Sequence, residues 1–148
     1  MGRKKKVTEE ARRLLGVVWE AQKEIDRLNN LKEKLKSQAE KVTTTYSDMP
    51  PGGHNPSSRS DTYDKLIDTE NKIGEAVHRW CNAIAEVQTV LSWVEDGRER
   101  LVLEYRYVNC EDWITISFRL NYSVQHIYRI HGVALYKLAM MLKKDERK

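Results

Sequence analysis

The most regular pattern in the chain lies in residues 63–94, and it restricts the fold to long helices. Apolar side chains recur there in alternating steps of three and four, with Glu70 as the polar member of the series: Tyr63, Leu66, Glu70, Ile73, Val77, Trp80, Ile84, Val87, Leu91 and Val94. This spacing places side chains on one face of an α-helix. A stripe this narrow does not stabilise a single helix in water, so it must be buried against a partner. We expect a long helix over about 61–95, with Asp61 as its N-cap.

A second stretch of the same kind precedes it. Apolar or small residues again recur in steps of three or four, with Lys, Arg and Glu between them: Leu14, Val18, Ala21, Ile25, Leu28, Leu31, Leu35, Ala39 and Val42. Thr8 is a suitable N-cap, and the acidic residues that follow it suit the positive end of the helix dipole. The pattern predicts one helix over about 9–45, preceded by a basic, disordered tail at residues 1–7. The short step from Leu28 to Leu31 would overwind the stripe locally.

Residues 46–60 interrupt the helical pattern. The sequence Pro50-Pro51-Gly52-Gly53 is incompatible with a helix interior. A flexible connection of this length lets the chain reverse, so we expect an antiparallel helical hairpin within residues 1–95. Glu70 could pair with a lysine of the facing helix and fix the register, or simply lie exposed at the edge of the stripe. The hairpin could also pair with a second subunit, so the pattern leaves a homodimer open.

Residues 109–142 contain two helices that are joined by a tight turn. Asp112 is a good N-cap for the first helix, whose apolar face holds Trp113, Ile116, Ser117 and Leu120. Asn121 tolerates a left-handed backbone and can turn the chain, after which Ser123 can cap the second helix. That helix carries one apolar stripe, formed by Ile127, Ile130, Ala134, Leu135, Leu138 and Leu142. The arrangement is typical of a helix-turn-helix.

The other side of the second helix is polar and aromatic. It holds Val124, Gln125, Tyr128, Arg129 and Tyr136. An ordinary helical hairpin inside a core is the alternative interpretation, and the exposed Gln125 and Arg129 argue against it. Residues 98–107 add a third, shorter helix before this pair. We therefore expect an all-α chain in which residues 96–148 form a small trihelical DNA-binding unit.

The distribution of charge agrees with a nucleic-acid partner. The formal net charge is +4 and the pI about 9.0, which permits nucleic-acid binding without requiring it. From Arg119 to Lys148 there are seven Lys or Arg residues against two Asp or Glu residues. The end of the chain that holds the second helix is therefore basic, as phosphate contacts require.

The sequence argues against several other classes of protein. No apolar run reaches the length of a membrane span, and the basic residues 3–6 are not followed by a signal-peptide core. Cys81 and Cys110 have no metal-ligand spacing and suggest no disulfide framework, so a reduced cytoplasmic protein is expected. No nucleophile–base pair, metal cluster or phosphate-binding loop occurs, so we expect neither an enzyme nor a bound cofactor.

A longer motif runs through the last third of the chain. Its residues are Arg98, Glu99, Arg100, Leu103, Arg106, Tyr107, Trp113, Ile116, Ser117, Leu120, Asn121, Ser123, Ile127, Ile130, Ala134, Leu135, Lys137 and Leu138. This order and spacing resemble region four of the sigma factors of RNA polymerase, which is itself built around a helix-turn-helix. Two positions depart from that region: Asn121 replaces the glycine of the turn, and Ser117 replaces a small alanine where two helices cross.

The resemblance implies a DNA-binding transcription regulator. The chain lacks an aromatic, basic segment of the kind with which sigma factors melt promoter DNA, and the helical hairpin stands in its place. This arrangement resembles the small phage-encoded regulators of late genes in Gram-positive hosts. It implies an activator that binds double-stranded DNA and contacts RNA polymerase in the cytoplasm of a bacterial host. Two alternatives stay open: a small terminase-like subunit for DNA packaging, and a helical adaptor that does not bind DNA.

The helix-turn-helix geometry assigns roles to individual side chains. The helix after Ser123 would enter the major groove with its first turns nearest the bases. There, Gln125 can read adenine, Arg129 can read guanine or grip a phosphate, and Val124 can contact a thymine methyl group. Further contacts, at the edge of this surface or to phosphates, are expected from Tyr122, His126, Tyr128, Arg119 and Lys137.

Two residues of the same helix are expected to serve packing. His131 falls near the apolar stripe, where a histidine is more often a hydrogen-bonded packing residue than a ligand. Gly132 costs a helix interior about 1 kcal/mol relative to alanine. We expect it to permit the close approach of a neighbouring backbone.

Overall fold

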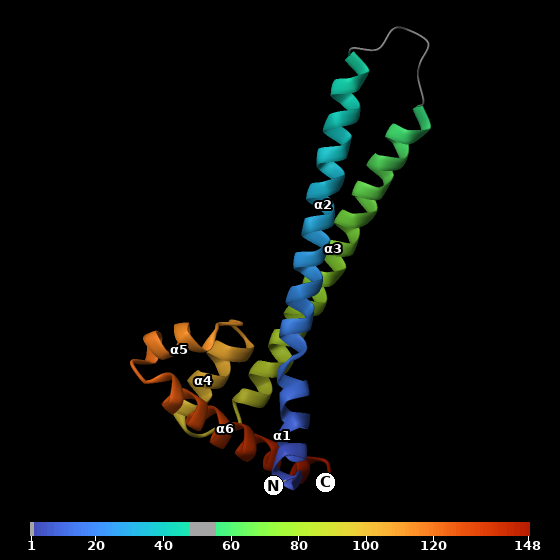
Figure 1. The fold of residues 1–148 in the computed structure, drawn as a ribbon. Coiled ribbons are helices and arrows are strands. Elements are labelled where there is room, and N and C mark those ends of the chain that lie inside the picture. Colours follow the sequence, from blue (N-terminus) through green and yellow to red (C-terminus); the bar gives the residue numbers. More distant parts are fainter. Residues whose placement is uncertain (1, 48–55) are drawn as a thin grey trace. The chain divides into compact units, whose positions relative to one another are not determined.

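The protein is all-helical in the part of the chain that the computed structural model describes, which is residues 2–47 and 56–148. The helices of these ranges are α1 (Gly2–Leu15), α2 (Val17–Ser47), α3 (Pro56–Leu91), α4 (Gly97–Tyr107), α5 (Trp113–Leu120) and α6 (Val124–Asp145) (Figure 1). The all-α class predicted from the sequence is confirmed. Over the same ranges, no helix combines the length and the apolar character that crossing a membrane requires.

The chain divides into two compact units. One consists of Ala21–Arg79, and the other of the described residues up to Glu20 together with Trp80–Lys148. The sequence had suggested a division into residues 1–95 and 96–148. The observed units differ because the end of α3 and the start of the chain contribute core residues to the C-terminal helices, including Ala11, Leu15 and Val87.

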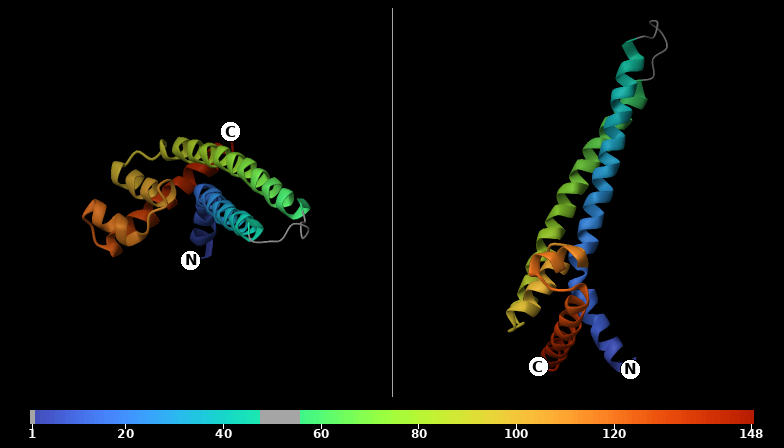
Figure 2. Two further views of the ribbon diagram at one scale, coloured as in Figure 1. Left: turned by 90° about the horizontal axis from the view of Figure 1, so that it is seen from above. Right: turned by 60° about the vertical axis from the view of Figure 1, so that its left-hand side comes forward.

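The Ala21–Arg79 unit is a helical hairpin. Within it, α2 and α3 lie side by side and run in opposite directions (Figures 1 and 2). Leu28, Leu35 and Ala39 are buried on α2, and Thr69 and Ala76 on α3. The ammonium of Lys32 lies 3.1 Å from Glu70 Oε1, and the Glu70 side chain is 50% exposed, so Glu70 both lies at the edge of the seam and pairs with a lysine of the facing helix.

The buried face of α3 is displaced by one residue from part of the predicted stripe. The buried positions Thr69, Ala76, Ala83 and Val90 recur every seven residues. The predicted members Tyr63 and Val77 are instead 41% and 39% exposed. A search for large apolar residues overlooks small ones, although small side chains suit a closely packed helical seam. The buried hydroxyl of Thr69 costs little, because it donates a 2.7 Å hydrogen bond to the Lys65 carbonyl.

The stripe on α2 is also more regular than predicted. Leu31 is 39% exposed, whereas the side chain of Lys32 is only 27% exposed. The aliphatic stem of Lys32 therefore covers the seam between Leu28 and Leu35, and its charge reaches Glu70. The steps of three and four therefore continue from Leu28 through Lys32 to Leu35, and the buried stripe does not contain the short step from Leu28 to Leu31.

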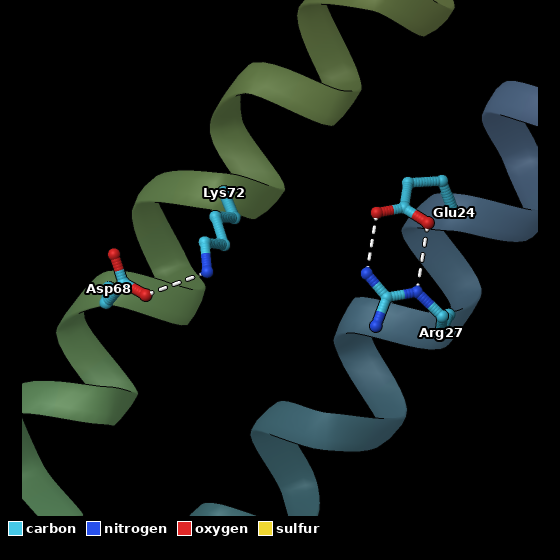
Figure 3. Close-up of polar contacts among 4 residues, drawn as sticks. All are labelled: Glu24, Arg27, Asp68 and Lys72. Carbon is cyan, nitrogen blue, oxygen red and sulfur yellow. Dashed lines mark hydrogen bonds and ion pairs between the residues drawn. The ribbon is translucent and has the colours of Figure 1, made fainter.

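The outer faces of the hairpin carry pairs of opposite charge. Arg27 makes a bidentate contact with Glu24, with hydrogen bonds of 2.7 and 2.9 Å (Figure 3). On α3, Lys72 Nζ lies 3.0 Å from Asp68 Oδ2 (Figure 3). These pairs link residues three or four apart on one helix, and they are exposed, so each adds little stability. They leave these faces with balanced charge.

Several predicted helix ends are corrected. Residues 2–7 begin α1 and are not a disordered tail, and Thr8 lies inside that helix. The predicted helix over 9–45 is interrupted at Gly16, where a Cβ atom would lie 3.0 Å from the Arg12 carbonyl. Asp61 is interior to α3, which begins at Pro56, a residue that suits the first position of a helix. Of the predicted loop, residues 46–47 and 56–60 are helical, and residues 48–55 lie outside the described residues.

Two apolar clusters hold the second unit together. The larger joins α1, α3, α4 and α6 through side chains such as Leu15, Val87, Leu103 and Leu138. The smaller consists of Val102, Ile116 and Ile127, one from each of α4, α5 and α6, and all three are fully buried. The smaller cluster fixes α5 and α6 on α4, so the last three helices form the expected trihelical arrangement.

Candidate nucleic-acid interface

The first helix of the pair, α5, is capped as the sequence predicts. Asp112 Oδ1 accepts a 2.8 Å hydrogen bond from the Thr115 amide, and Oδ2 accepts a 3.0 Å bond from the Thr115 hydroxyl. These hydrogen bonds to Thr115 lower the pKa of Asp112. The carboxylate therefore stays ionised at neutral pH and satisfies a free amide of the first turn.

The turn between α5 and α6 also has the predicted conformation. Asn121 adopts φ 55° and ψ 44°, which is the left-handed region. The Tyr122 amide donates to the Ser117 carbonyl at 3.1 Å, and the Ser117 hydroxyl donates to the Tyr122 carbonyl at 2.8 Å. Ser117, which replaces the alanine of the resembling motif, thus closes the turn with a second hydrogen bond. Ser123 then caps α6 by accepting from the His126 amide at 3.2 Å.

The first turns of α6 present the expected polar side chains to solvent. Gln125, Tyr128 and Arg129 are exposed, whereas Ile127 and His131 are buried. Tyr128 is 50% exposed, and its ring lies 5.0 Å from the Trp113 ring, measured between centroids. The packing against Trp113 supports one side of Tyr128 while the other stays accessible. Three of the predicted contact residues therefore share one outward face.

Three further predicted residues lie at the edge of this face. Tyr122, Val124 and His126 are half-buried. The rings of Tyr122 and His126 meet edge to face, with 4.9 Å between their centroids. This contact fixes the two rings where the chain leaves the turn and enters α6.

Arg119 and Lys137, the predicted phosphate clamps, are each engaged with an acidic residue. Arg119 Nε lies 2.9 Å from Glu111 Oε2. Lys137 Nζ donates a 2.7 Å hydrogen bond to Glu99 Oε1, whose side chain is only 10% exposed, and this bond raises the pKa of Lys137. Lys137 also lies eight residues after Arg129, which is about 12 Å farther along the helix axis. Neither residue belongs to the face formed by Gln125, Tyr128 and Arg129.

The structure adds Arg98 to the candidate interface. A concavity of about 170 Å³ lies between the start of α4 and α6, and it is lined by Asp96, Arg98, Glu99, His126, Arg129, Ile130 and Val133. Arg98 is exposed on the first turn of α4, and a hydrogen bond with Tyr122 raises the pKa of its guanidinium. The arrangement therefore brings Arg98 to the same concavity as His126 and Arg129.

A signal in the sequence could have located this turn. Asp96 is followed three residues later by Glu99, which is the spacing of a helix-capping box. Asp96 Oδ1 accepts from the amides of Arg98 and Glu99 at 2.9 and 3.0 Å, and these hydrogen bonds lower the pKa of Asp96. With Asp96 as the N-cap, α4 begins at Gly97, one residue before the predicted start, and Arg98 lies in its exposed first turn.

His131 has the packing role that the sequence predicts. It is 6% exposed, its Nε2 lies 2.8 Å from the Tyr107 hydroxyl, and the Trp113 ring meets it edge to face. Burial lowers the pKa of His131 to about 4, and the charges of Arg12 and Arg106 act in the same direction. The imidazole is therefore neutral at physiological pH and adds no charge to the candidate interface.

Over residues 2–47 and 56–148, no group of three or more His, Cys, Asp or Glu side chains is arranged to hold a metal ion. Comparisons with known protein families, curated proteins and solved structures find no match for this chain.

Proposed function

We propose that this protein is a sequence-specific regulator of transcription that binds double-stranded DNA through α5 and α6. The observation that carries the proposal is the capped turn from Asp112 to Ser123. It supports α6 on a buried cluster while Gln125, Tyr128 and Arg129 face outward. In a helix-turn-helix, these positions lie nearest the base edges of the major groove.

The side chains divide into two kinds of contact. Gln125 and Arg129 have the donor and acceptor groups that read adenine and guanine in bidentate pairs. Arg98 and His126, which line the same concavity as Arg129, would contact phosphates. Base reading by Gln125 and Arg129 would supply specificity, and the phosphate contacts would set the register of the protein on the duplex.

The partners beyond DNA follow from the hairpin and from the resemblance to sigma region four. We propose that the protein is a phage-type activator of late genes, and that the α2–α3 hairpin either contacts RNA polymerase or joins two subunits. The balanced charge on the outer faces of the hairpin supports a protein partner there rather than DNA. Action in the cytoplasm of a bacterial host is part of the same proposal.

Selection of bound duplexes from a random pool tests the proposal directly. We expect one recurring motif, and binding that weakens steeply with salt, because phosphate contacts release counterions. A palindromic motif with two protein chains per duplex would identify a homodimer. Absence of salt-dependent binding would overturn the proposal in favour of an adaptor, and a ring of many subunits in light scattering would point to a DNA-packaging subunit.

A further inference from the structure

Gly132 is a glycine inside a helix that nothing in the described part of the chain requires. It lies in the middle of α6, it is exposed, and a Cβ atom built on it meets no atom within 4 Å. Glycine is less favourable than alanine in a helix interior. The sequence predicts that a neighbouring backbone approaches Gly132, and no described residue of this chain provides that backbone. The space over Gly132 is open to a partner.

The residues around Gly132 continue the candidate interface. Gly132 lies four residues after Tyr128, three after Arg129 and four before Tyr136, so helical spacing places it on their face. Tyr128 is 50% exposed and Tyr136 38% exposed. The exposed face that begins at Gln125 thus extends past Gly132 without a break.

The charge of α6 indicates what kind of partner fits there. From Val124 to Lys144 the helix carries no acidic residue, and besides Lys137, which is paired with Glu99, it carries the basic residues Arg129, Lys143 and Lys144. Among the described residues, Gly74 on α3 is the other exposed glycine that lies inside a helix, away from its ends, with open space around it, and it lies among residues of both signs, namely Glu70, Lys72 and Glu75. A polyanion is therefore favoured at Gly132 and not at Gly74.

We propose that Gly132 lets the sugar–phosphate backbone of duplex DNA pack directly against the main chain of α6. Without a side chain at this position, the wall of the major groove can approach the helix between Arg129 and Tyr136. This inference rests on the proposed DNA-binding function and deepens it. Gly132 would then set how deeply α6 enters the major groove. Its contact would be with the sugar–phosphate backbone and not with the bases.

A glycine-to-alanine pair tests the inference, with the selected duplex and a random duplex as probes. Gly132→Ala should bind both about tenfold more weakly, a loss of the size of one contact, and Gly132→Leu more weakly still. The matched control, Gly74→Ala, should bind both as the unaltered chain does. Both alanine variants should raise Tm by about 2–5 °C, because alanine is the better helix former. A folding defect therefore cannot imitate the binding result.

Three outcomes would overturn the inference. If Gly132→Ala binds duplex DNA as tightly as the unaltered chain, no backbone packs on this glycine. If Gly132→Ala breaks a dimer while the affinity per chain is unchanged, the close partner is a second copy of the protein. If the unaltered chain shows no salt-dependent binding to any duplex, the proposed function fails and this inference fails with it.

Discussion

The indole Nε1 of Trp19 donates a 2.9 Å hydrogen bond to the carbonyl of Arg106, and the Arg106 guanidinium lies 4.8 Å from the centre of the Trp19 ring. The same guanidinium lies 4.5 Å from the centre of the Trp113 ring and donates a 2.9 Å hydrogen bond to the Glu111 carbonyl. Arg106 therefore contacts both indole rings and is hydrogen-bonded to the connection between α4 and α5. Its role here is structural, and it supports the candidate interface indirectly.

Arg106→Lys should lower the free energy of unfolding by about 2 kcal/mol. Lysine keeps the charge, but it loses the planar stacking between two indoles and the hydrogen bond to Glu111. Urea unfolding followed by tryptophan fluorescence measures the change, and Arg27→Lys on the exposed face of the hairpin is the matched control and should leave stability unchanged. Equal stability of both variants with the unaltered chain would show that the indole sandwich adds nothing.

The stability of the protein should fall as the pH is lowered from about 6.5 to about 4. The pKa of His131 is lowered to about 4 in the folded state, so the unfolded chain binds the proton first as the pH decreases. The difference is worth about 3 kcal/mol, fully available above pH 6.5 and lost by pH 4. The groups facing His131 are the Tyr107 hydroxyl, the Trp113 ring and the guanidinium groups of Arg12 and Arg106, and burial raises the pKa of Tyr107.

Urea unfolding at several pH values checks this, with His131→Gln as the test variant. The variant should be less stable at pH 7.5, and the gap from the unaltered chain should close towards pH 4. His78→Gln replaces an exposed histidine and should follow the unaltered chain at every pH. A gap that stays constant with pH would mean that His131 does not cause the decline. Asp96 and Asp112, whose pKa values are lowered, add their own loss only at more acidic pH.

The α5–turn–α6 segment could be predicted closely from the sequence because its signals are local. Asp112, Asn121 and Ser123 each act on amides or dihedral angles within a few residues, so their chemistry does not depend on the rest of the fold. The buried face of α3 was less predictable. Thr69, Ala76 and Ala83 are buried by their position against other helices, and nothing in their own chemistry distinguishes them from exposed small residues.

The parts that sequence reasoning missed depend on contacts between distant segments. Trp19 and Arg106 are 87 positions apart, and the periodicity of the two helices that carry them does not reveal that they meet. The pairing of Lys137 with Glu99 is of the same kind, and it changes how a basic residue on α6 is interpreted. Cys110 adopts φ 55° between α4 and α5, although cysteine carries no signal for a left-handed backbone. It lies at the end of α4, where the Glu111 amide donates a 3.0 Å hydrogen bond back to the Tyr105 carbonyl.

Asn121 should tolerate glycine but not alanine. Its backbone is left-handed, which glycine adopts freely and alanine does not, so Asn121→Ala should lower the free energy of unfolding by about 1 kcal/mol. Asn121→Gly should leave stability nearly unchanged and restore the residue found in the resembling motif. Thermal unfolding of the two variants in parallel checks this. Equal losses in both would indicate that the Asn121 side chain, rather than its dihedral angles, matters.

Substitutions of Lys137 and Arg129 should have different effects, the first mainly on stability and the second mainly on DNA binding. Lys137→Gln leaves the nearly buried Glu99 carboxylate without its ammonium partner, so it should reduce stability more than DNA affinity. Arg129→Ala should keep stability and weaken binding to the selected duplex by about 1–3 kcal/mol, and less on random DNA if Arg129 reads a base. Electrophoretic shift and urea unfolding on the same preparations measure both quantities.

A double variant, Glu99→Gln with Lys137→Gln, removes both charges and should recover stability. If Lys137→Gln instead loses as much affinity as Arg129→Ala at unchanged stability, Lys137 is the phosphate clamp that the sequence alone suggests.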